Sequence, residues 1–279
     1  MKLYNIIVGN EVHLALETAR GLIDVTAAGF APDMDAVIAG AGMEELKRLA
    51  CDSSLPLVES PVYANVVNRV GKLVCVGLNY RNHAEGVKMQ LPEYPILFSK
   101  FDNALAPANS EVCLPAWEQS YDYEAELVIV IGKETWNVSR EEALSHVFGY
   151  TCGNDFSVRD AQMRSGQWLI GKTMPGFGPC GPCIVTADGY DVAAGKRVKS
   201  FVNGALRQDG TTADMIFPVE EIVSYASKYI KLAPGDLIFT GTPSGVALED
   251  REDVRRWLVP GDRVDVEIEG IGTLTNLMV

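Results

Sequence analysis

The segment Tyr121–Gly132 constrains the fold more than any other part of the chain. Its second half, Leu127–Ile131, is a run of aliphatic and β-branched residues closed by Gly132, which is typical of a buried strand. Its first half carries Glu124 and Glu126, two residues apart. Because side chains alternate between the two faces of a strand, both carboxylates point the same way, with their stems about 6–7 Å apart. The sequence therefore predicts a buried strand whose entrance carries paired acidic side chains.

This acidic pair has two interpretations. Like charges beside a hydrophobic strand repel each other, and desolvation adds to the cost, so a divalent cation between them would remove the conflict. Oxygen-only ligands favour Mg²⁺, Mn²⁺ or Ca²⁺ over zinc. The alternative is a solvated strand entrance that holds no ion. If an ion is held, a third oxygen ligand is needed, and Asp155 is the best candidate because it lies in a compact charged loop between apolar segments.

Composition and charge exclude several classes of protein. The chain has 279 residues, of which 47% are hydrophobic and 22% charged, so it can bury a sizeable core. A net charge of -13 argues against nucleic acid as a partner. An anionic substrate would need a local cluster of cations or a metal. No apolar run approaches the ~18–20 residues of a membrane span, so no membrane partner is expected. Six Cys without a secretory signal predict reduced thiols and a cytoplasmic location.

The chain divides into two expected units. Residues 1–66 are predicted to form a small N-terminal domain, and residues 67–279 a catalytic domain. From Lys72 onward, short strands separated by Gly, Pro and Asn outnumber the helices, and one longer helix is expected from Val219 to about Ile230, after Pro218. This pattern predicts a β-rich α+β fold with mostly antiparallel or mixed sheets, and not a βαβ nucleotide-binding fold.

Two short motifs copy known sites without their structural context. Gly166–Thr173 matches the phosphate-loop pattern, but no buried strand precedes it and Pro175 prevents a helix from following it. Cys180 and Cys183 have the spacing of a redox pair, yet the residues after them continue as a strand, and no second pair exists for zinc. The sequence therefore predicts neither a nucleotide site nor a thiol site.

Three other features are candidates for chemistry near a metal. His83 is the one His in a loop rich in polar residues after a strand, where catalytic groups are often displayed. Lys172 lies among Gly residues and could neutralise developing negative charge. The segment Thr240–Gly245 follows an apolar strand, and its backbone amides and hydroxyls could receive a carboxylate.

Several motifs, in this order, resemble the fumarylacetoacetate hydrolase superfamily, in particular bacterial acylpyruvate hydrolases and 2-hydroxyhepta-2,4-diene-1,7-dioate isomerases. The resemblance covers about residues 70–279. Its motifs are Val76–His83, Asp122–Leu127, Asn154–Asp160, Gly171–Lys172, Val202–Gly204, Thr240–Gly245 and Gly270–Leu274. The resemblance implies a mixed β-sandwich roll behind a small N-terminal domain, and a homodimer. It also implies Mg²⁺ or Mn²⁺ held by Glu124, Glu126 and Asp155.

The resemblance further implies roles around the substrate. His83 would be the base, and Gln162 and Lys172 would lie near the reacting carbonyls. Four more residues match positions in or near the substrate site: Lys100, Arg159, Thr242 and Tyr80.

One position departs from the family pattern. In family hydrolases a Glu commonly follows the His by three residues and pairs with it to activate water. Here that position is Gly86, and Glu85 lies one residue earlier. On a helix, Glu85 would point about 100° away from the direction of the usual Glu. Either Glu85 replaces it through a different loop shape, or water activation is weakened, which would favour a family reaction without water.

The sequence therefore leaves three functions open. The first is a divalent-metal-dependent hydrolase that cleaves a C–C bond in a 2,4-dioxo acid, such as an acylpyruvate or fumarylpyruvate, through a metal-stabilised pyruvate enolate. In that reaction His83 would deprotonate the attacking water. The second uses the same enolate chemistry as an oxaloacetate-type decarboxylase or a 2-hydroxy-dienoate isomerase. The third is a non-catalytic binding protein, and the presence of five matching site residues argues against it.

Overall fold

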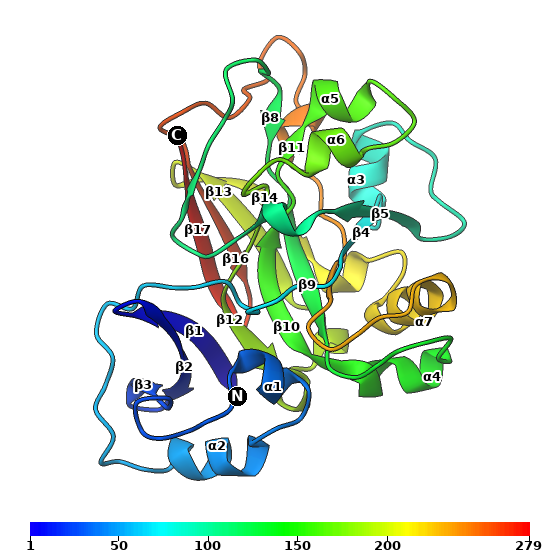
Figure 1. The fold of residues 1–279 in the computed structure, drawn as a ribbon. Coiled ribbons are helices and arrows are strands. Elements are labelled where there is room, and N and C mark those ends of the chain that lie inside the picture. The colour runs from blue at the N-terminus through cyan, green and yellow to red at the C-terminus, as the bar shows by residue number, and fades with distance from the viewer.

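A computed structural model describes all 279 residues, and ten of its strands form one large mixed sheet (Figure 1). The strand β9 (Ala125–Ile131) lies between its neighbours β10 and β15, and all seven of its residues are buried. The buried strand predicted from the apolar run is therefore confirmed. Along the sheet the order is β3 (Gly21–Asp24), β2 (Glu11–Thr18), β1 (Lys2–Val8), β12 (Gly178–Thr186), β10 (Val147–Asn154), β9, β15 (Leu237–Phe239), β4 (Leu73–Gly77) and β5 (Ile96–Lys100), and β6 (Leu105–Ala106) pairs with β12.

A second sheet of five strands packs against this one. Its order is β14 (Ala205–Thr211), β13 (Arg197–Val202), β16 (Arg263–Ile268), β17 (Gly272–Met278) and β7 (Glu111–Val112). The largest hydrophobic cluster contains Leu127 and Ile129 of β9 together with Val266 of β16 and Leu274 of β17. The core therefore lies between two sheets, as the predicted β-rich fold with mixed sheets requires, and that prediction is confirmed. A short pair, β8 (Tyr121–Asp122) and β11 (Ser157–Val158), forms a third, separate ladder.

The N-terminal residues extend the large sheet. Strand β1 pairs with β12 through Lys2 with Val185 and Leu3 with Ile184. The helices α1 (Met34–Ile38) and α2 (Met43–Ala50) lie beside β1–β3 (Figure 1). Leu3 and Leu46 belong to the same hydrophobic cluster as Val128 of β9. The N-terminal unit thus shares both a sheet and a core with the rest of the chain, and its boundary at residue 66 stays a prediction.

The remaining helices are short, with one exception. The exception, α7 (Val219–Tyr229), confirms the helix predicted after Pro218. The others are α3 (Arg81–Gly86), α4 (Arg140–Ala143), α5 (Arg159–Met163) and α6 (Leu169–Lys172). Single 3₁₀ turns are η1 (Asp102–Ala104), η2 (Leu144–His146), η3 (Ala187–Gly189), η4 (Val192–Ala194), η5 (Thr212–Asp214) and η6 (Ala247–Glu249). No helix has both the length and the apolar character needed to cross a membrane.

Neither the phosphate-loop pattern nor the cysteine pair has the structure of the site that it copies. The segment Gly166–Thr173 contains the four-residue helix α6 and follows the helix α5, so no strand leads into it. Cys180 and Cys183 both lie on β12, are buried, and are free thiols. The chemistry-bearing residues gather instead at one end of β9 and β10, near α3, α5 and α6 (Figure 1).

Candidate active site

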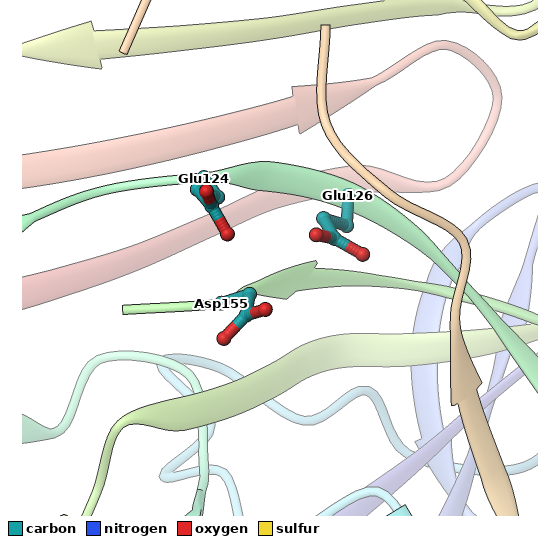
Figure 2. Close-up of side chains that lie close together, drawn as sticks. All are labelled: Glu124, Glu126 and Asp155. Atoms are coloured by element: carbon teal, nitrogen blue, oxygen red, sulfur yellow. The ribbon is translucent and has the colours of Figure 1, made fainter. Parts of the chain in front are cut away.

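Three buried carboxylates meet at the end of β9 and β10. Glu124 directly precedes β9, Glu126 is its second residue, and Asp155 directly follows β10. The antiparallel pairing of these strands brings them together, and the Asp155 amide donates to the Glu124 carbonyl at 2.9 Å. One oxygen of each side chain lies within 4.8 Å of the others, and Figure 2 shows the three groups around a common space. The predicted convergence of the three acidic side chains is thus present.

Two cations neutralise Glu124. Arg159 Nη2 donates to Glu124 Oε1 at 2.8 Å, and Lys172 Nζ donates to Glu124 Oε2 at 2.5 Å. Burial alone would raise the pKa of Glu124, but the charges of Arg159 and Lys172 outweigh it and hold that pKa far below its usual range. Burial likewise disfavours the charged form of Lys172, yet the carboxylates of Asp155 and Glu124 raise its pKa. Both groups are therefore ionised.

Asp155 has one oxygen that accepts no hydrogen bond. Lys172 Nζ donates to Asp155 Oδ2 at 2.9 Å. Lys100 Nζ lies 2.5 Å from Asp155 Oδ1, but its three hydrogens are directed to the backbone carbonyls of Phe156, Lys172 and Phe177. Oδ1 is therefore ion-paired with Lys100 but accepts no hydrogen bond. A carboxylate oxygen has two lone pairs, so Oδ1 retains the capacity to bind a metal ion.

Glu126 has no cation beside it. Its Oε2 accepts from the Gly241 amide at 2.7 Å. Burial, followed by repulsion from Asp155 and Glu124, raises the pKa of Glu126 well above its usual range. Four buried carboxylates, those of Asp122, Glu124, Glu126 and Asp155, thus face only three buried cations, those of Lys100, Arg159 and Lys172. The donor set and this charge imbalance fit a hard divalent cation held by the triad.

The raised pKa of Glu126 predicts proton release on metal binding. Because a ligating carboxylate must be ionised, Mg²⁺ affinity should fall about tenfold per pH unit below that raised pKa. The folded pKa exceeds the unfolded one, so the metal-free protein should gain stability as pH falls through the folded value. Calorimetry of Mg²⁺ binding in two buffers of different ionisation enthalpy measures the released proton. Glu126→Gln should abolish the release, and proton-free binding by the parent at every pH from acid to neutral would contradict this assignment.

His83 has a carboxylate partner that the sequence did not reveal. His83 lies in α3 and is buried, and its Nδ1 donates to Glu249 Oε1 at 2.5 Å. Glu249 Oε2 accepts from the Ser244 hydroxyl and from the Gly245 amide at 2.9 Å. The carboxylate is thereby fixed, and it holds the imidazole with Nδ1 protonated. Glu85, expected near His83, is exposed and has no hydrogen bond with it, so the partner comes from η6 instead.

Gly86 is part of the same arrangement. A Cβ added to Gly86 would lie 2.7 Å from Glu249 Cδ and 2.8 Å from Glu249 Oε2. Glu249 therefore occupies the space that a side chain at residue 86 would need. In the sequence, the absence of a side chain at residue 86 suggested weakened water activation. In the structure, the space beside Gly86 is filled by the carboxylate of Glu249.

Gly86→Ala should therefore impair the His83–Glu249 pair. A helical Gly→Ala change ordinarily stabilises a protein by about 0.5–1 kcal/mol, but here the new methyl group displaces Glu249. We expect turnover to fall about tenfold or more. This loss is part of the roughly 10²–10⁴-fold rate enhancement that a positioned general base contributes. Steady-state kinetics measure the loss. Gly166→Ala is the matched control, because a Cβ there meets nothing within 4 Å. Equal activity of the two variants would contradict the assignment.

The other expected site residues divide into two groups. A cavity of about 760 Å³ is lined by the triad, His83 and Glu249, and also by Arg159, Gln162, Lys172 and Thr242. Gln162 Oε1 accepts from Arg159 Nη1 at 3.0 Å, which leaves its amide hydrogens for a ligand. Thr242 Oγ1 donates to the Ala125 carbonyl at 2.9 Å and accepts from Gln208.

Two residues expected at the substrate do not line this cavity. Lys100 is buried behind Asp155, and its hydrogens go to backbone carbonyls. Tyr80 is the residue before α3, and its buried hydroxyl has no hydrogen-bond partner. Their expected contact with substrate is therefore not supported: Lys100 holds Asp155, and Tyr80 packs in the core.

Comparisons with known proteins identify the family of the chain. Residues 72–279 match the family described as Fumarylacetoacetate (FAA) hydrolase C-terminal. A Dictyostelium discoideum relative, "Fumarylacetoacetate hydrolase domain-containing protein 2 homolog", is 46% identical over 74% of this chain and 70% of its own. The human "Oxaloacetate tautomerase FAHD2A, mitochondrial" is 36% identical over 96% of this chain and 87% of its own.

A solved structure shares the fold as well. The fumarylpyruvate hydrolase from Pseudomonas aeruginosa, in complex with Mn²⁺ and pyruvate, has a TM-score of 0.70 and is 34% identical. The match covers 80% of this chain and 98% of that one. The resemblance drawn from the ordered motifs is thereby confirmed. On this evidence, the chain belongs to the fumarylacetoacetate hydrolase family.

Proposed function

We propose that this protein is a divalent-metal-dependent enzyme that interconverts the enol and keto forms of oxaloacetate or a closely related 2-oxo dicarboxylic acid. The observation that carries the proposal is that the acidic triad and the His83–Glu249 pair line one cavity. A chelated oxo-acid and a base that moves its proton are the two requirements of this reaction. The printed activity of the human relative, oxaloacetate tautomerase, supports the choice of substrate.

Glu124, Glu126 and Asp155 would hold Mg²⁺ or Mn²⁺, which when bound polarises the 2-oxo group as a Lewis acid. The buried charges then favour an anionic substrate. With the metal bound and all carboxylates ionised, the two charges of the ion balance the excess of the five carboxylates, Glu249 included, over the three buried cations. The ion and the Lys172 ammonium then present positive charge to an anionic substrate in a low-dielectric cavity.

His83 would transfer the proton. Because Nδ1 is bound to Glu249, Nε2 is the ring nitrogen left for substrate. When the enol becomes the keto form, the hydroxyl loses a proton and C3 gains one, so the atoms balance without a co-reactant. We assign both transfers to Nε2: it would take up the proton that the hydroxyl loses and deliver a proton to C3, and the reverse direction would remove the C3 proton through the same nitrogen. The ammonium of Lys172 and the free amide hydrogens of Gln162 would stabilise the negative charge on the substrate oxygen during transfer.

Hydrolysis of a C–C bond in an acylpyruvate is the second candidate. The observation that favours it is again Glu249. Activation of water by His83 needs a carboxylate bound to the imidazole; Gly86 cannot supply one, and Glu249 does. The cavity of about 760 Å³ also has room for an acyl group larger than that of oxaloacetate. The fumarylpyruvate hydrolase of similar fold supports this second reaction.

One set of assays separates the reactions. Protein stripped of metal and reloaded with Mg²⁺ would be tested for decay of oxaloacetate enol by ultraviolet absorbance. Pyruvate release from oxaloacetate and from acylpyruvates would be followed with a coupled dehydrogenase, and 2-hydroxy-dienoate isomerisation by absorbance. We expect enol decay to have the highest kcat/KM and to require metal. A higher kcat/KM for pyruvate release from an acylpyruvate would assign hydrolysis instead, and faster release from oxaloacetate would assign decarboxylation.

A further inference from the structure

Glu249 lies on a segment with little internal support. We call Gly245–Asp250 the strap; it contains the single 3₁₀ turn η6. Its internal hydrogen bonds are three: the Glu249 amide donates to the Val246 carbonyl and the Asp250 amide to the Ala247 carbonyl, each at 3.1 Å, and the Gly245 amide donates to Glu249 Oε2 at 2.9 Å. A 3₁₀ turn has poorer hydrogen-bond geometry than an α-helix and is rarely stable alone. The position of Glu249 at His83 therefore depends on side chains that hold the strap from outside.

The amides of the strap are held by Asp122. Asp122 Oδ1 accepts from the Ala247 amide at 2.8 Å, and Oδ2 accepts from the Leu248 amide at 3.1 Å. The same Oδ2 accepts from Arg159 Nε at 2.8 Å. Because Asp122 lies two residues before Glu124, this contact joins the strap to the strand that carries the acidic triad.

Three carbonyls of the strap, those of Ala247, Leu248 and Asp250, are held by one arginine. Arg255 Nε donates to the carbonyls of Ala247 and Asp250 at 3.1 and 3.2 Å. Arg255 Nη2 donates to the carbonyls of Leu248 and Asp250 at 2.9 and 2.7 Å. The carbonyls of Leu248 and Asp250 have no other backbone partner, whereas that of Ala247 also accepts from the Asp250 amide. Leu248 and Asp250 flank Glu249, so the planar guanidinium fixes the backbone on both sides of it.

We propose that Arg255 is a positioning residue for the acid–base pair, which acts by fixing the strap so that Glu249 stays bound to His83. The proposal rests on the proposed function in one respect, that His83 is the base. It holds for tautomerisation and for hydrolysis alike, because both reactions need the same pair.

The competing role is direct binding of substrate. Arg255 lines the cavity, and its Nη1 has no hydrogen bond with the protein, so it could receive a distal carboxylate. The two roles differ in kinetics. An anchor for a carboxylate changes KM, and only for dicarboxylic substrates, whereas a positioning residue changes kcat for every substrate that uses His83.

The kinetic test uses Arg255→Gln, Arg255→Lys and Arg256→Gln. Arg256 is the matched control, because its exposed side chain reaches only Asp262, at 3.3 Å, and not the strap. We expect Arg255→Gln to lower kcat about tenfold while KM stays within about twofold of the parent value. The loss in kcat is part of the rate enhancement that a positioned general base contributes. Arg255→Lys should recover part of the loss, and Arg256→Gln should match the parent. An unchanged kcat, or a rise in KM confined to dicarboxylic substrates, would overturn the proposal.

A double-mutant cycle tests whether Arg255 acts through Glu249. Adding Arg255→Gln to Glu249→Gln should cause no further loss of kcat, because the carboxylate that Arg255 positions is already gone. A full additional loss would show that Arg255 acts elsewhere.

A spectroscopic test does not depend on knowing the substrate. The chain has three His, so the imidazole ¹⁵N signals of the metal-free protein can be assigned with His13 and His146 as internal references. At fixed pH, Arg255→Gln should move the His83 Nδ1 signal toward its value in Glu249→Gln. An unmoved His83 signal would overturn the proposal. If the signal moves but the parent protein is inactive on every oxo-acid tested, Arg255 is still a positioning residue. That result would reject the proposed function and not the role of Arg255.

Discussion

Replacing His83 by Ala is expected to lower turnover about 10²–10⁴-fold while leaving Mg²⁺ binding intact, the size of effect ordinarily due to a positioned base. The imidazole lines the cavity but is not one of the three clustered carboxylate ligands. Its loss leaves Glu249 with two remaining donors, Ser244 and Gly245, so the carboxylate is not left unsatisfied. Kinetics on the best substrate measure the first effect, and calorimetry with Mg²⁺ measures the second.

The control for this variant is another histidine. His146 lies on η2, and its Nδ1 is bound to the Thr135 hydroxyl at 3.0 Å, outside the cavity. His146→Ala should therefore retain turnover. A His83→Ala enzyme as active as the parent would remove His83 from the mechanism. Loss of Mg²⁺ binding together with activity would instead place the imidazole among the metal ligands.

The convergence of the acidic triad was largely predictable because it depends on local rules. Alternation along one strand puts Glu124 and Glu126 on one face, whatever the rest of the chain does. Asp155 follows the neighbouring strand, and antiparallel pairing of β9 with β10 is enough to bring it to Glu124. The motifs that matched a known family then added Lys172, Gln162 and Arg159, all of which line the cavity.

The partner of His83 was not predictable, because it depends on long-range packing. Glu249 is 166 positions away in sequence, and the strap that carries it to His83 is bound by residues as distant as Asp122 and Arg207. No local pattern marks a carboxylate in a 3₁₀ turn as catalytic. The usable signal is Gly86: the sequence suggests either replacement by Glu85 or weakened water activation, whereas the structure has Glu249 in the space beside Gly86.

Hydrogen-bond partners distinguish two lysines that the resemblance places near the site. Lys100 and Lys172 are both buried cations beside Asp155, yet only Lys172 lines the cavity. Three backbone carbonyls take the hydrogens of Lys100, so its charge is committed to structure. A motif gives the residue type, and only the arrangement of carbonyls around the ammonium distinguishes a supporting lysine from one available to substrate.

Lys172→Met is expected to have the second large effect, on stability and on turnover together. The Lys172 ammonium bridges Glu124 and Asp155 and is fully buried. Removing one partner of a buried ion pair costs about 3–5 kcal/mol, because the remaining charges are left uncompensated. The metal-free variant should lose stability of that order in denaturant unfolding. Lys231→Met is the control, since Lys231 pairs with Glu134 at the exposed surface, where a pair contributes about 0–1 kcal/mol.

Mg²⁺ should restore Lys172→Met more than it stabilises the parent. Without the ammonium, the triad attracts a divalent ion more strongly, and a ligand that binds only the folded state stabilises it in proportion to the logarithm of its affinity. Turnover should still fall about 10²–10³-fold with metal bound, because the charge that stabilises the substrate oxygen is gone. Calorimetry, unfolding with and without Mg²⁺, and kinetics separate these effects. Weaker Mg²⁺ binding by the variant would mean that Lys172 arranges the carboxylates for the ion and does not compete with it.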